Sequence, residues 1–432
     1  MHTILNHRPY LNRRERQTRH RGLRIETSTF PQLFVVVGLL VLTLMLPTPV
    51  RAHATINAAS ELFASNVSGE YLCPRQMMRR VPGHCPPYGP GAREVRVEYL
   101  RTRLPNPLPT LEIEEIETDE GAITKYTFAY VRPLPAASYR HPEEAAVGMP
   151  PVRQFLAGDN WVSVMGSVEY GDQLWYEINP DEYILADHLS FTSPSRFSGV
   201  VLSEQPAYPF AWINRRVTPS VTPGGAPNGE VTLNRYERIT IYAEESLGAE
   251  LWYMVGTDQW VEQSFTSRVD VDPPPEGVGQ GEKWIEINTY EQTLAAYQGE
   301  RMVFATLISS GRPSTWTPSG LTRIWGKYRT APMQNRDVTP DSPAWYYLED
   351  VQWTQYFNEA YALHAAYWHN AFSFTRSHGC VNLALQDARW LFDWTTPFVP
   401  DDTRVLYSAS AQAGTWVWVH KTPPFPGSVA AQ

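Results

Sequence analysis

The sequence contains only three cysteines in 432 residues, and it has no excess of basic residues. Its formal net charge is −9, with 36 Lys and Arg against 45 Asp and Glu. A charge of this sign argues against nucleic acid as a partner, because phosphate binding needs a basic surface. The hydrophobic fraction of 43% excludes a chain that is disordered as a whole, and the length favours two to four domains.

A membrane-spanning apolar segment is also missing. The longest apolar run, residues 33–46, has 14 residues, fewer than the ~20 that span a bilayer. An arginine-rich lead precedes the run, and Ala52-His53-Ala54 has the form of a cleavage site. Residues 1–54 are therefore predicted to be a signal peptide, with an uncleaved signal anchor as the alternative. We expect an exported, extracytoplasmic protein that contacts a membrane only if this segment is retained.

The spacing of the three cysteines predicts one pair and one free thiol. Cys73 and Cys85 lie close together, whereas Cys380 stands alone far downstream. In an exported protein the near pair predicts a disulfide, and the odd cysteine requires a separate explanation. A zinc site is disfavoured because only His84 lies beside the pair and a closed site needs four ligands. No metal site is expected.

An internal repeat occupies the middle of the chain. The segment GDQLWY at 171–176 recurs as GAELWY at 248–253, an offset of 77 (248 − 171). Upstream, FAYV at 128–131 matches FAWI at 210–213, an offset of 82 (210 − 128). Two copies are too few for a solenoid, so the pattern predicts two tandem β-domains, at 126–200 and 205–271. The copies resemble bacterial Src-homology-three-like domains, which are small barrels often attached to cell-wall enzymes.

The rest of the chain divides into three parts. Residues 55–125 form an N-terminal β-rich segment of unknown role, and the Pro- and Gly-rich residues 272–283 form a linker. Residues 284–420 form the third unit, with a hairpin from 284–288 and 293–297 and one main helix at 383–394. The helix should bury Leu385, Ala388, Leu391 and Phe392 and carry Asp387, Arg389 and Asp393 at the edges of that face. The fold class is therefore mainly β: two barrel-like repeats, then a third β unit that carries one helix.

Chemically active residues gather near the end of the third unit. Cys380 is a nucleophile only as a thiolate, so it needs a nearby base or a positive field. His364 and His378 are both candidate bases, and residue spacing does not choose between them. The N-terminus of the predicted helix is a third way to favour the anion. Backbone N–H groups beside Gly379 could hold an oxyanion.

The segment SHGCVN at 377–382, with a histidine sixteen residues before the cysteine (380 − 364), resembles the signature of L,D-transpeptidase catalytic domains. SSG at 309–311 and TPSG at 317–320 resemble two further elements of this family. The resemblance covers about 282–410 and implies a β-sandwich catalytic domain. It implies that Cys380 is the nucleophile, that His364 is the base, and that the carbonyl of Ala365 can orient the base. The implied supporting residues are His378, Gly379, Ser377, Asn382 and Tyr347, whereas His369 is expected only in the pocket wall or at the surface.

The resemblance also implies a reaction. Cys380 would form a thioester with one peptidoglycan stem peptide, and the amine of a second stem would resolve it into a cross-link, without a cofactor. The alternatives are an L,D-carboxypeptidase, in which water resolves the thioester, and a non-catalytic cell-wall-binding module. The same resemblance implies that the protein lies at the cell wall or on the outer face of the membrane. It also implies possible contact between the repeats and wall polymer.

The cysteine pattern makes a direct prediction. In the native exported protein a maleimide should modify one thiol, Cys380, and non-reducing digestion should yield Cys73 and Cys85 in one linked peptide. A disulfide that closes so short a loop contributes roughly 3 kcal/mol to stability by the chain-entropy model. Three modified thiols would contradict the pairing.

Overall fold

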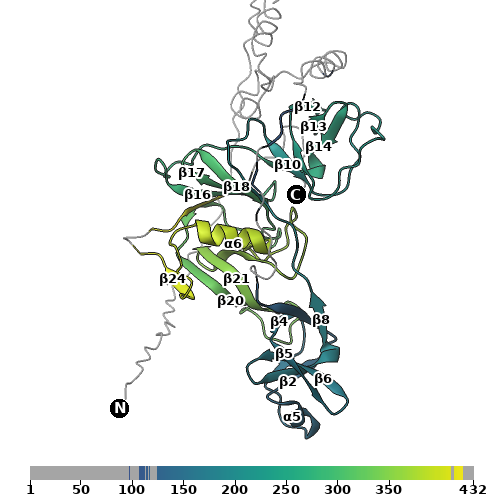
Figure 1. The fold of residues 1–432 in the computed structure, drawn as a ribbon, viewed down its shortest axis with the longest axis vertical. Helices are drawn as coiled ribbons and strands as arrows, with labels where there is room; N and C mark the ends of the chain where they lie inside the picture. Colours follow the sequence, from purple (N-terminus) through teal and green to yellow (C-terminus); the bar gives the residue numbers. More distant parts are fainter. Residues whose placement is uncertain are drawn as a thin grey trace, which may run out of the picture. The chain divides into compact units, whose positions relative to one another are not determined.

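The computed structural model describes residues 124–409 and 413–421, together with residues 97, 107–111, 113, 114 and 116. The described part is mainly β, as expected, with two α-helices (Figure 1). No helix among these residues is long and apolar enough to cross a membrane. The predicted signal segment 1–54, the cysteines of the predicted disulfide and most of 55–125 lie outside the described residues.

The first repeat consists of eight strands and a short helix. The strands are β1 (Thr127–Val131), β2 (Ala136–Tyr139), β3 (Arg153–Phe155), β4 (Asp159–Val164), β5 (Gly166–Tyr170), β6 (Gln173–Asn179), β7 (Glu182–Leu185) and β8 (Leu189–Thr192). Helix α5 (Pro142–Ala146) follows β2, and a 3-10 turn, η2 (Ala186–His188), precedes β8. β9 (Val200–Val201) follows the repeat and pairs with a strand of the third unit.

The second repeat follows the same plan with fewer strands. It contains β10 (Phe210–Ile213), β11 (Arg238–Thr240), β12 (Ala243–Leu247), β13 (Glu250–Gly256), β14 (Gln259–Glu262), η3 (Gln263–Phe265) and β15 (Thr266–Val269). From β5 and β12 onward, each element of one copy begins 77 residues from its counterpart in the other. Even the β-bulge recurs, between Glu177 and Asn179 in the first copy and between Met254 and Gly256 in the second.

The turns of the repeat explain which residues recur. Gly171 and Gly248 both have positive φ, at 61° and 63°, and both occupy the turn of the central hairpin. Asp181 and Asp258 have φ of 58° and 56° in the next turn, a conformation that Asp tolerates better than most residues. The predicted repeat is therefore a structural repeat. Its sheets are open, however, so the expected barrel closure is not found among the described residues.

The third unit is a sandwich of two sheets. Its strands are β16 (Lys283–Asn288), β17 (Thr293–Gln298), β18 (Arg301–Leu307), β19 (Gly320–Arg323), β20 (Gly326–Gln334), β21 (Tyr346–Asn358), β22 (Tyr361–Ala365), β23 (Val381–Leu383), β24 (Val405–Tyr407) and β25 (Trp416–His420). One sheet has the order β19-β25-β16-β17-β18-β9; the other contains β23-β22-β21, with β20 paired to β21 and β24. The predicted hairpin is β16–β17.

A continuous apolar core joins these two sheets. Ile285 and Phe304 of the first sheet pack in one buried cluster with Leu363 and Val381 of the second. Leu385, Ala388 and Leu391 of helix α6 (Leu385–Trp394) belong to the same cluster. The core residues of β22 and β23 have odd numbers, so alternation along the strands directs their even-numbered residues to the opposite face.

Helix α6 confirms the predicted helix, although residue 383 belongs to β23 instead. The four predicted apolar residues are buried. Asp387, which was expected at the edge of the apolar face, is fully buried and accepts hydrogen bonds from Thr306 Oγ1 (2.5 Å) and Gly199 N–H (2.8 Å). At the other end, the ammonium of Lys327 donates to the carbonyls of Phe392 (2.5 Å) and Thr395 (3.0 Å). A cation in that position satisfies helix carbonyls that lack partners within the helix.

The first repeat is not structurally separate from the third unit, because the two share one β-sheet. β4 pairs in parallel with β21, so β8-β1-β4 extends the sheet that contains β22 and β23. Phe128 of β1 stacks on Tyr367, with ring centroids 3.7 Å apart and planes 5° apart. An ion pair between Arg153 and Glu349 (3.2 Å) crosses the same boundary.

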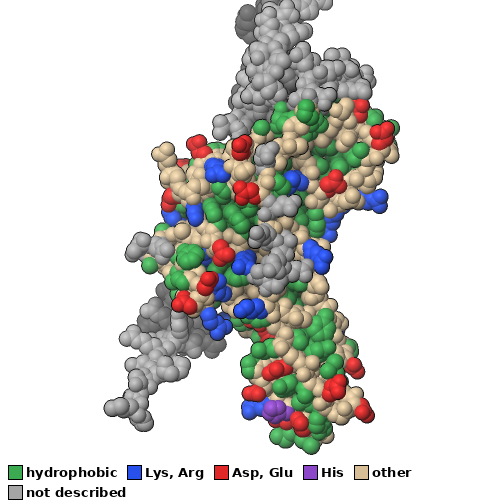
Figure 2. All heavy atoms as spheres, in the orientation of Figure 1, with side chains coloured by type: hydrophobic (Ala, Val, Ile, Leu, Met, Phe, Trp, Pro, Cys, Tyr) green, Lys and Arg blue, Asp and Glu red, His purple; other side chains and the backbone are tan. Residues whose placement is uncertain are grey.

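The first repeat also exposes many large apolar side chains, visible where green atoms gather over β2, β5 and β6 (Figure 2). These side chains are Val147, Met149, Val152, Leu156, Met165, Val168, Tyr170, Leu174 and Phe191. The second repeat differs at equivalent positions, because β15 is buried along its whole length whereas β8 is not.

Phe128 should therefore support the catalytic unit as well as its own repeat. We expect Phe128→Ala to lower the free energy of unfolding by about 3–5 kcal/mol, because it leaves a cavity between Leu348, Val351 and Tyr367. The control Phe191→Ala removes a phenylalanine that is 49% exposed and should change the free energy by no more than about 0.5 kcal/mol. Denaturant unfolding measures both, and equal effects would contradict the shared core.

Candidate active site

The pairing of two short strands assembles the candidate site. β22 and β23 are parallel, with His364 opposite Asn382. Because paired residues of neighbouring strands project to the same face, these two side chains lie together on the face away from the core. Cys380 precedes β23, and its Sγ lies 4.0 Å from the carbonyl oxygen of Ala360, just before β22. The fifteen residues between His364 and Cys380 thus lead from the end of β22 back to the neighbouring strand.

The ring of His364 is fixed by its neighbour. Nδ1 lies 3.1 Å from the carbonyl oxygen of Ala365, and a carbonyl only accepts, so Nδ1 carries the proton and Nε2 keeps its lone pair. His364 is buried, and this burial lowers its pKa to about 4, while the bond to Ala365 acts in the opposite direction. At neutral pH the imidazole is therefore neutral and able to accept a proton at Nε2.

The thiol of Cys380 is also held neutral. Although the residue is partly exposed, burial of the sulfur raises the pKa of the thiol to about 11, and a hydrogen bond with the backbone of Ala362 lowers it. The dipole of helix α6 does not stabilise a Cys380 thiolate, because β23 and Ala384 separate Cys380 from the first residue of α6. The dipole acts only near the first turn, so this sequence-based option is wrong. The resting pair is a neutral thiol and a neutral imidazole.

Backbone contacts hold the segment before the cysteine. The backbones of Ser309 and Gly311 form β-bridges with Asn382 and Ser377, so the SSG segment at 309–311 pairs with both ends of the SHGCVN segment. Thr317 Oγ1 accepts from Gly311 N–H (3.0 Å) and donates to the carbonyl of Gly379 (2.8 Å). These contacts fix the turn on which Cys380 sits.

Gly379 cannot be replaced without movement. Its φ is +118°, a region that side chains rarely enter, and a Cβ would lie 2.3 Å from Cε1 of Tyr361. Its N–H donates to Ser377 Oγ (3.0 Å), and this hydroxyl donates to the carbonyl of Cys380 (2.5 Å). Ser377 and Gly379 therefore shape the turn, and the N–H of Gly379 is already engaged.

His378 and two tyrosines flank the sulfur. The exposed ring of His378 stacks on Tyr346, with centroids 4.8 Å apart. Burial, together with the charge of a Cys380 thiolate, raises the pKa of Tyr346 to about 12; burial and then Cys380 also raise the pKa of Tyr356. These two tyrosines were not found from the sequence.

Tyr347 has different surroundings from those implied by the family signature. The guanidinium of Arg153 lies over its ring, 5.2 Å from the centroid, and its hydroxyl lies 3.5 Å from Glu349. Neighbours along β21 project to opposite faces, so Tyr346 takes the side of the nucleophile and Tyr347 the side of the first repeat. The sequence pattern selected Tyr347, whereas in the structure its neighbour Tyr346 lies on the side of Cys380.

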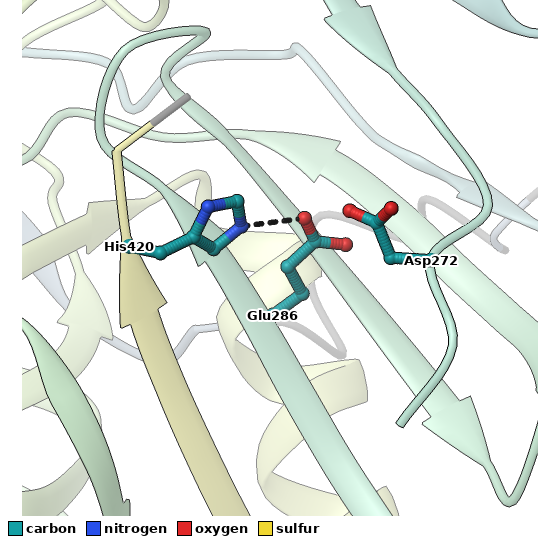
Figure 3. Close-up of side chains that lie close together, drawn as sticks. All are labelled: Asp272, Glu286 and His420. Carbon is teal, nitrogen blue, oxygen red and sulfur yellow. Dashed lines mark hydrogen bonds and ion pairs between the residues drawn. The ribbon is translucent and has the colours of Figure 1, made fainter. Parts of the chain in front are cut away.

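Asp272, Glu286 and His420 are the group within the described residues that could hold a cation, with carboxylate oxygens and a ring nitrogen within 4.8 Å of one another (Figure 3). Glu286 already bonds His420 Nε2 (2.7 Å) with one oxygen and Tyr297 OH (3.1 Å) with the other. The group links the linker to the first and last strands of the sandwich. It carries no step of the chemistry at Cys380.

The geometry places a cysteine directly before β23 and a histidine on the adjacent parallel strand β22 of a β-sandwich, an arrangement compatible with a cysteine acyltransferase. The YkuD family model, the L,D-transpeptidase catalytic domain, matches residues 282–419. The chain therefore carries an L,D-transpeptidase catalytic domain, and it is an acyltransferase of this kind.

The chain is similar to several individual proteins. YciB of Bacillus subtilis (strain 168), a protein assigned as an L,D-transpeptidase, is 24% identical over 178 residues, which are 34% of this chain and 79% of YciB. L,D-transpeptidase 3 of Mycobacterium tuberculosis is 17% identical, with 40% of this chain and 70% of that chain covered and a TM-score of 0.27. An L,D-transpeptidase of Mycobacterium smegmatis is 16% identical, with 61% and 94% covered and a TM-score of 0.28.

The pKa values of the His364 imidazole and the Cys380 thiol predict how alkylation of Cys380 depends on pH. The rate with iodoacetamide should rise as pH increases toward about 11, because only the thiolate reacts. His364→Ala should slow alkylation at neutral pH, where the neutral imidazole can take the thiol proton, and should change the rate little near pH 11. It should also lower activity by roughly 10²–10⁴.

His378→Ala is the matched histidine control and should move the alkylation profile less. The opposite ranking of these two variants would assign the base to His378. An unchanged profile in both would show that backbone contacts, such as that of Ala362, set the thiol pKa without either imidazole.

Proposed function

We propose that this enzyme forms peptidoglycan cross-links through a thioester on Cys380, with His364 as general base. The observation that carries the proposal is the β22–β23 register, which brings His364 beside the strand that follows Cys380. The fixed tautomer of His364 adds support, because a base needs its lone pair on the nitrogen that faces the reaction.

In the first half-reaction, Nε2 of His364 takes the proton of the Cys380 thiol, and the sulfur attacks the carbonyl carbon of the third stem residue. The tetrahedral intermediate collapses as the C–N bond to D-alanine breaks, and His364 returns the proton to the departing amine. Because Gly379 N–H already donates to Ser377, the N–H of Cys380 is the adjacent backbone donor for the oxyanion.

In the second half-reaction, the amine of another stem peptide attacks the thioester. His364 accepts a proton from this amine and passes it to the sulfur as the C–S bond breaks, which regenerates the Cys380 thiol and the neutral imidazole. Water in place of the amine would give a carboxypeptidase with the same residues. The alternative of a silent wall-binding module is disfavoured, because the chain has both Cys380 and His364 and the carbonyl oxygen of Ala365 lies 3.1 Å from Nδ1 of His364.

Export and wall contact complete the proposal. Peptidoglycan lies outside the cytoplasm, so residues 1–54 are proposed to direct export and to be removed afterwards. The exposed apolar and aromatic side chains of the first repeat, among them Tyr170 and Phe191, are proposed to contact wall polymer. Cys73 and Cys85 remain the proposed disulfide.

Substitution of the nucleophile tests the proposal. Cys380→Ala should abolish cross-link formation and covalent modification by a carbapenem, because the sulfur that forms the thioester is lost. Intact mass measures the acyl-enzyme, and chromatography of stem-peptide reactions measures the cross-linked dimer. The unfolding midpoint should change little, since a single sulfur is removed. Product formation by the variant would refute the assignment of Cys380.

A further inference from the structure

The side chains of Asn382 and His369 face each other near Cys380, and each presents a nitrogen to the other. Nδ2 of Asn382 lies 2.9 Å from Nε2 of His369. On its other side, Nδ1 of His369 accepts the backbone N–H of Ala371 at 3.2 Å. A backbone amide always donates here, so Nδ1 must carry the lone pair.

The protonation of His369 follows from this contact. A neutral imidazole has one bare nitrogen and one N–H, so a bare Nδ1 places the proton on Nε2. The ring is neutral at physiological pH, because burial lowers its pKa to about 3, with Arg376 and His364 acting in the same direction. Nε2–H therefore points at Asn382 and requires an acceptor, which an amide nitrogen is not.

Rotation of the amide by 180° resolves the conflict. The oxygen and nitrogen of an asparagine amide differ little in shape, and their assignment follows from the hydrogen-bond network. With Oδ1 as acceptor for Nε2–H of His369, the NH₂ group takes the outer position. Among the described residues, none forms a hydrogen bond with the amide at that outer position, although Asn382 is only 3% exposed.

We propose that His369 is a positioning residue that locks the Asn382 amide with its NH₂ group toward the Cys380–His364 face. There the NH₂ group donates to an acceptor oxygen, a carbonyl or carboxylate, of the acyl donor. This inference rests on the proposed acyl-transfer function. It assigns to His369 a role that the sequence did not suggest, since a wall or surface position was expected.

The tautomer can be measured without turnover. In the full chain labelled with ¹⁵N-histidine, two-bond ¹H–¹⁵N correlations should show His369 protonated at Nε2 and bare at Nδ1 at neutral pH, with the signal identified by its loss in His369→Gln. His188 provides an internal reference of the opposite kind, because its Nδ1 lies 2.7 Å from the carbonyl oxygen of Pro133. A proton on Nδ1 of His369, or on both nitrogens, would overturn the proposal.

Acylation kinetics test the consequence. His369→Phe keeps an aromatic ring but removes the donor, and should slow acylation of Cys380 by a carbapenem about tenfold, the value of one hydrogen bond. His369→Gln retains an N–H donor and should recover most of the rate. Asn382→Asp keeps the acceptor for His369 but presents an oxygen outward, and should lose roughly 100-fold by repulsion of the acceptor oxygen.

Intact mass over time measures these rates, and His141→Phe, at an exposed histidine of the first repeat, should match the wild type. Equal rates for His369→Phe and wild type would overturn the proposal, as would a His369→Gln variant no faster than His369→Phe. Failure of the proposed thioester function can be told apart from failure of this inference. The first would appear as product formation by Cys380→Ala, and it would leave the tautomer of His369 unchanged.

Discussion

The parallel pairing of β22 with β23 is the constraint on which the rest of the catalytic unit depends. It requires the chain to leave β22, travel through residues 366–379 and return beside the same strand. The buried side chains of both strands enter the sandwich core, so the opposite face is left for chemistry. Burial of that face then keeps the thiol and the imidazole neutral at rest. Charge appears only when a proton moves between them, which limits side reactions of the thiolate.

The supports around this pairing come from distant parts of the chain. The Ser309 and Gly311 backbones hold the turn of Cys380, while Asp387 of α6 binds Gly199, which lies between the two repeats. The first repeat extends the catalytic sheet through β4 and stacks Phe128 on Tyr367. Tyr367 belongs to the segment that also carries Trp368 and His369. The repeat thus contributes to the shape of the catalytic loop in addition to any contact it makes with the wall.

Local patterns predicted much of this fold. The offset of 77 residues, the hairpin β16–β17 and the apolar face of α6 all depend on neighbours in sequence, which a periodic pattern records. Long-range pairing was less accessible. The repeats were expected as closed barrels, yet their sheets are open and one of them joins the catalytic sheet. The burial of Asp387 was not predicted, because a sequence does not show that Thr306 and the Gly199 backbone satisfy a buried carboxyl.

For the site, the sequence by itself determined the family signature, the candidate nucleophile and two candidate bases, because each of these is a residue type at a fixed spacing. Tertiary structure decided what depends on contacts across the fold. It separated Tyr346 from Tyr347 by strand face, and it removed the helix dipole from Cys380 by inserting β23 before α6. It also gave His364 and His369 opposite tautomers, because one Nδ1 faces a carbonyl and the other faces an amide N–H. A proton's position on a ring depends on what the ring touches, and the sequence does not contain those contacts.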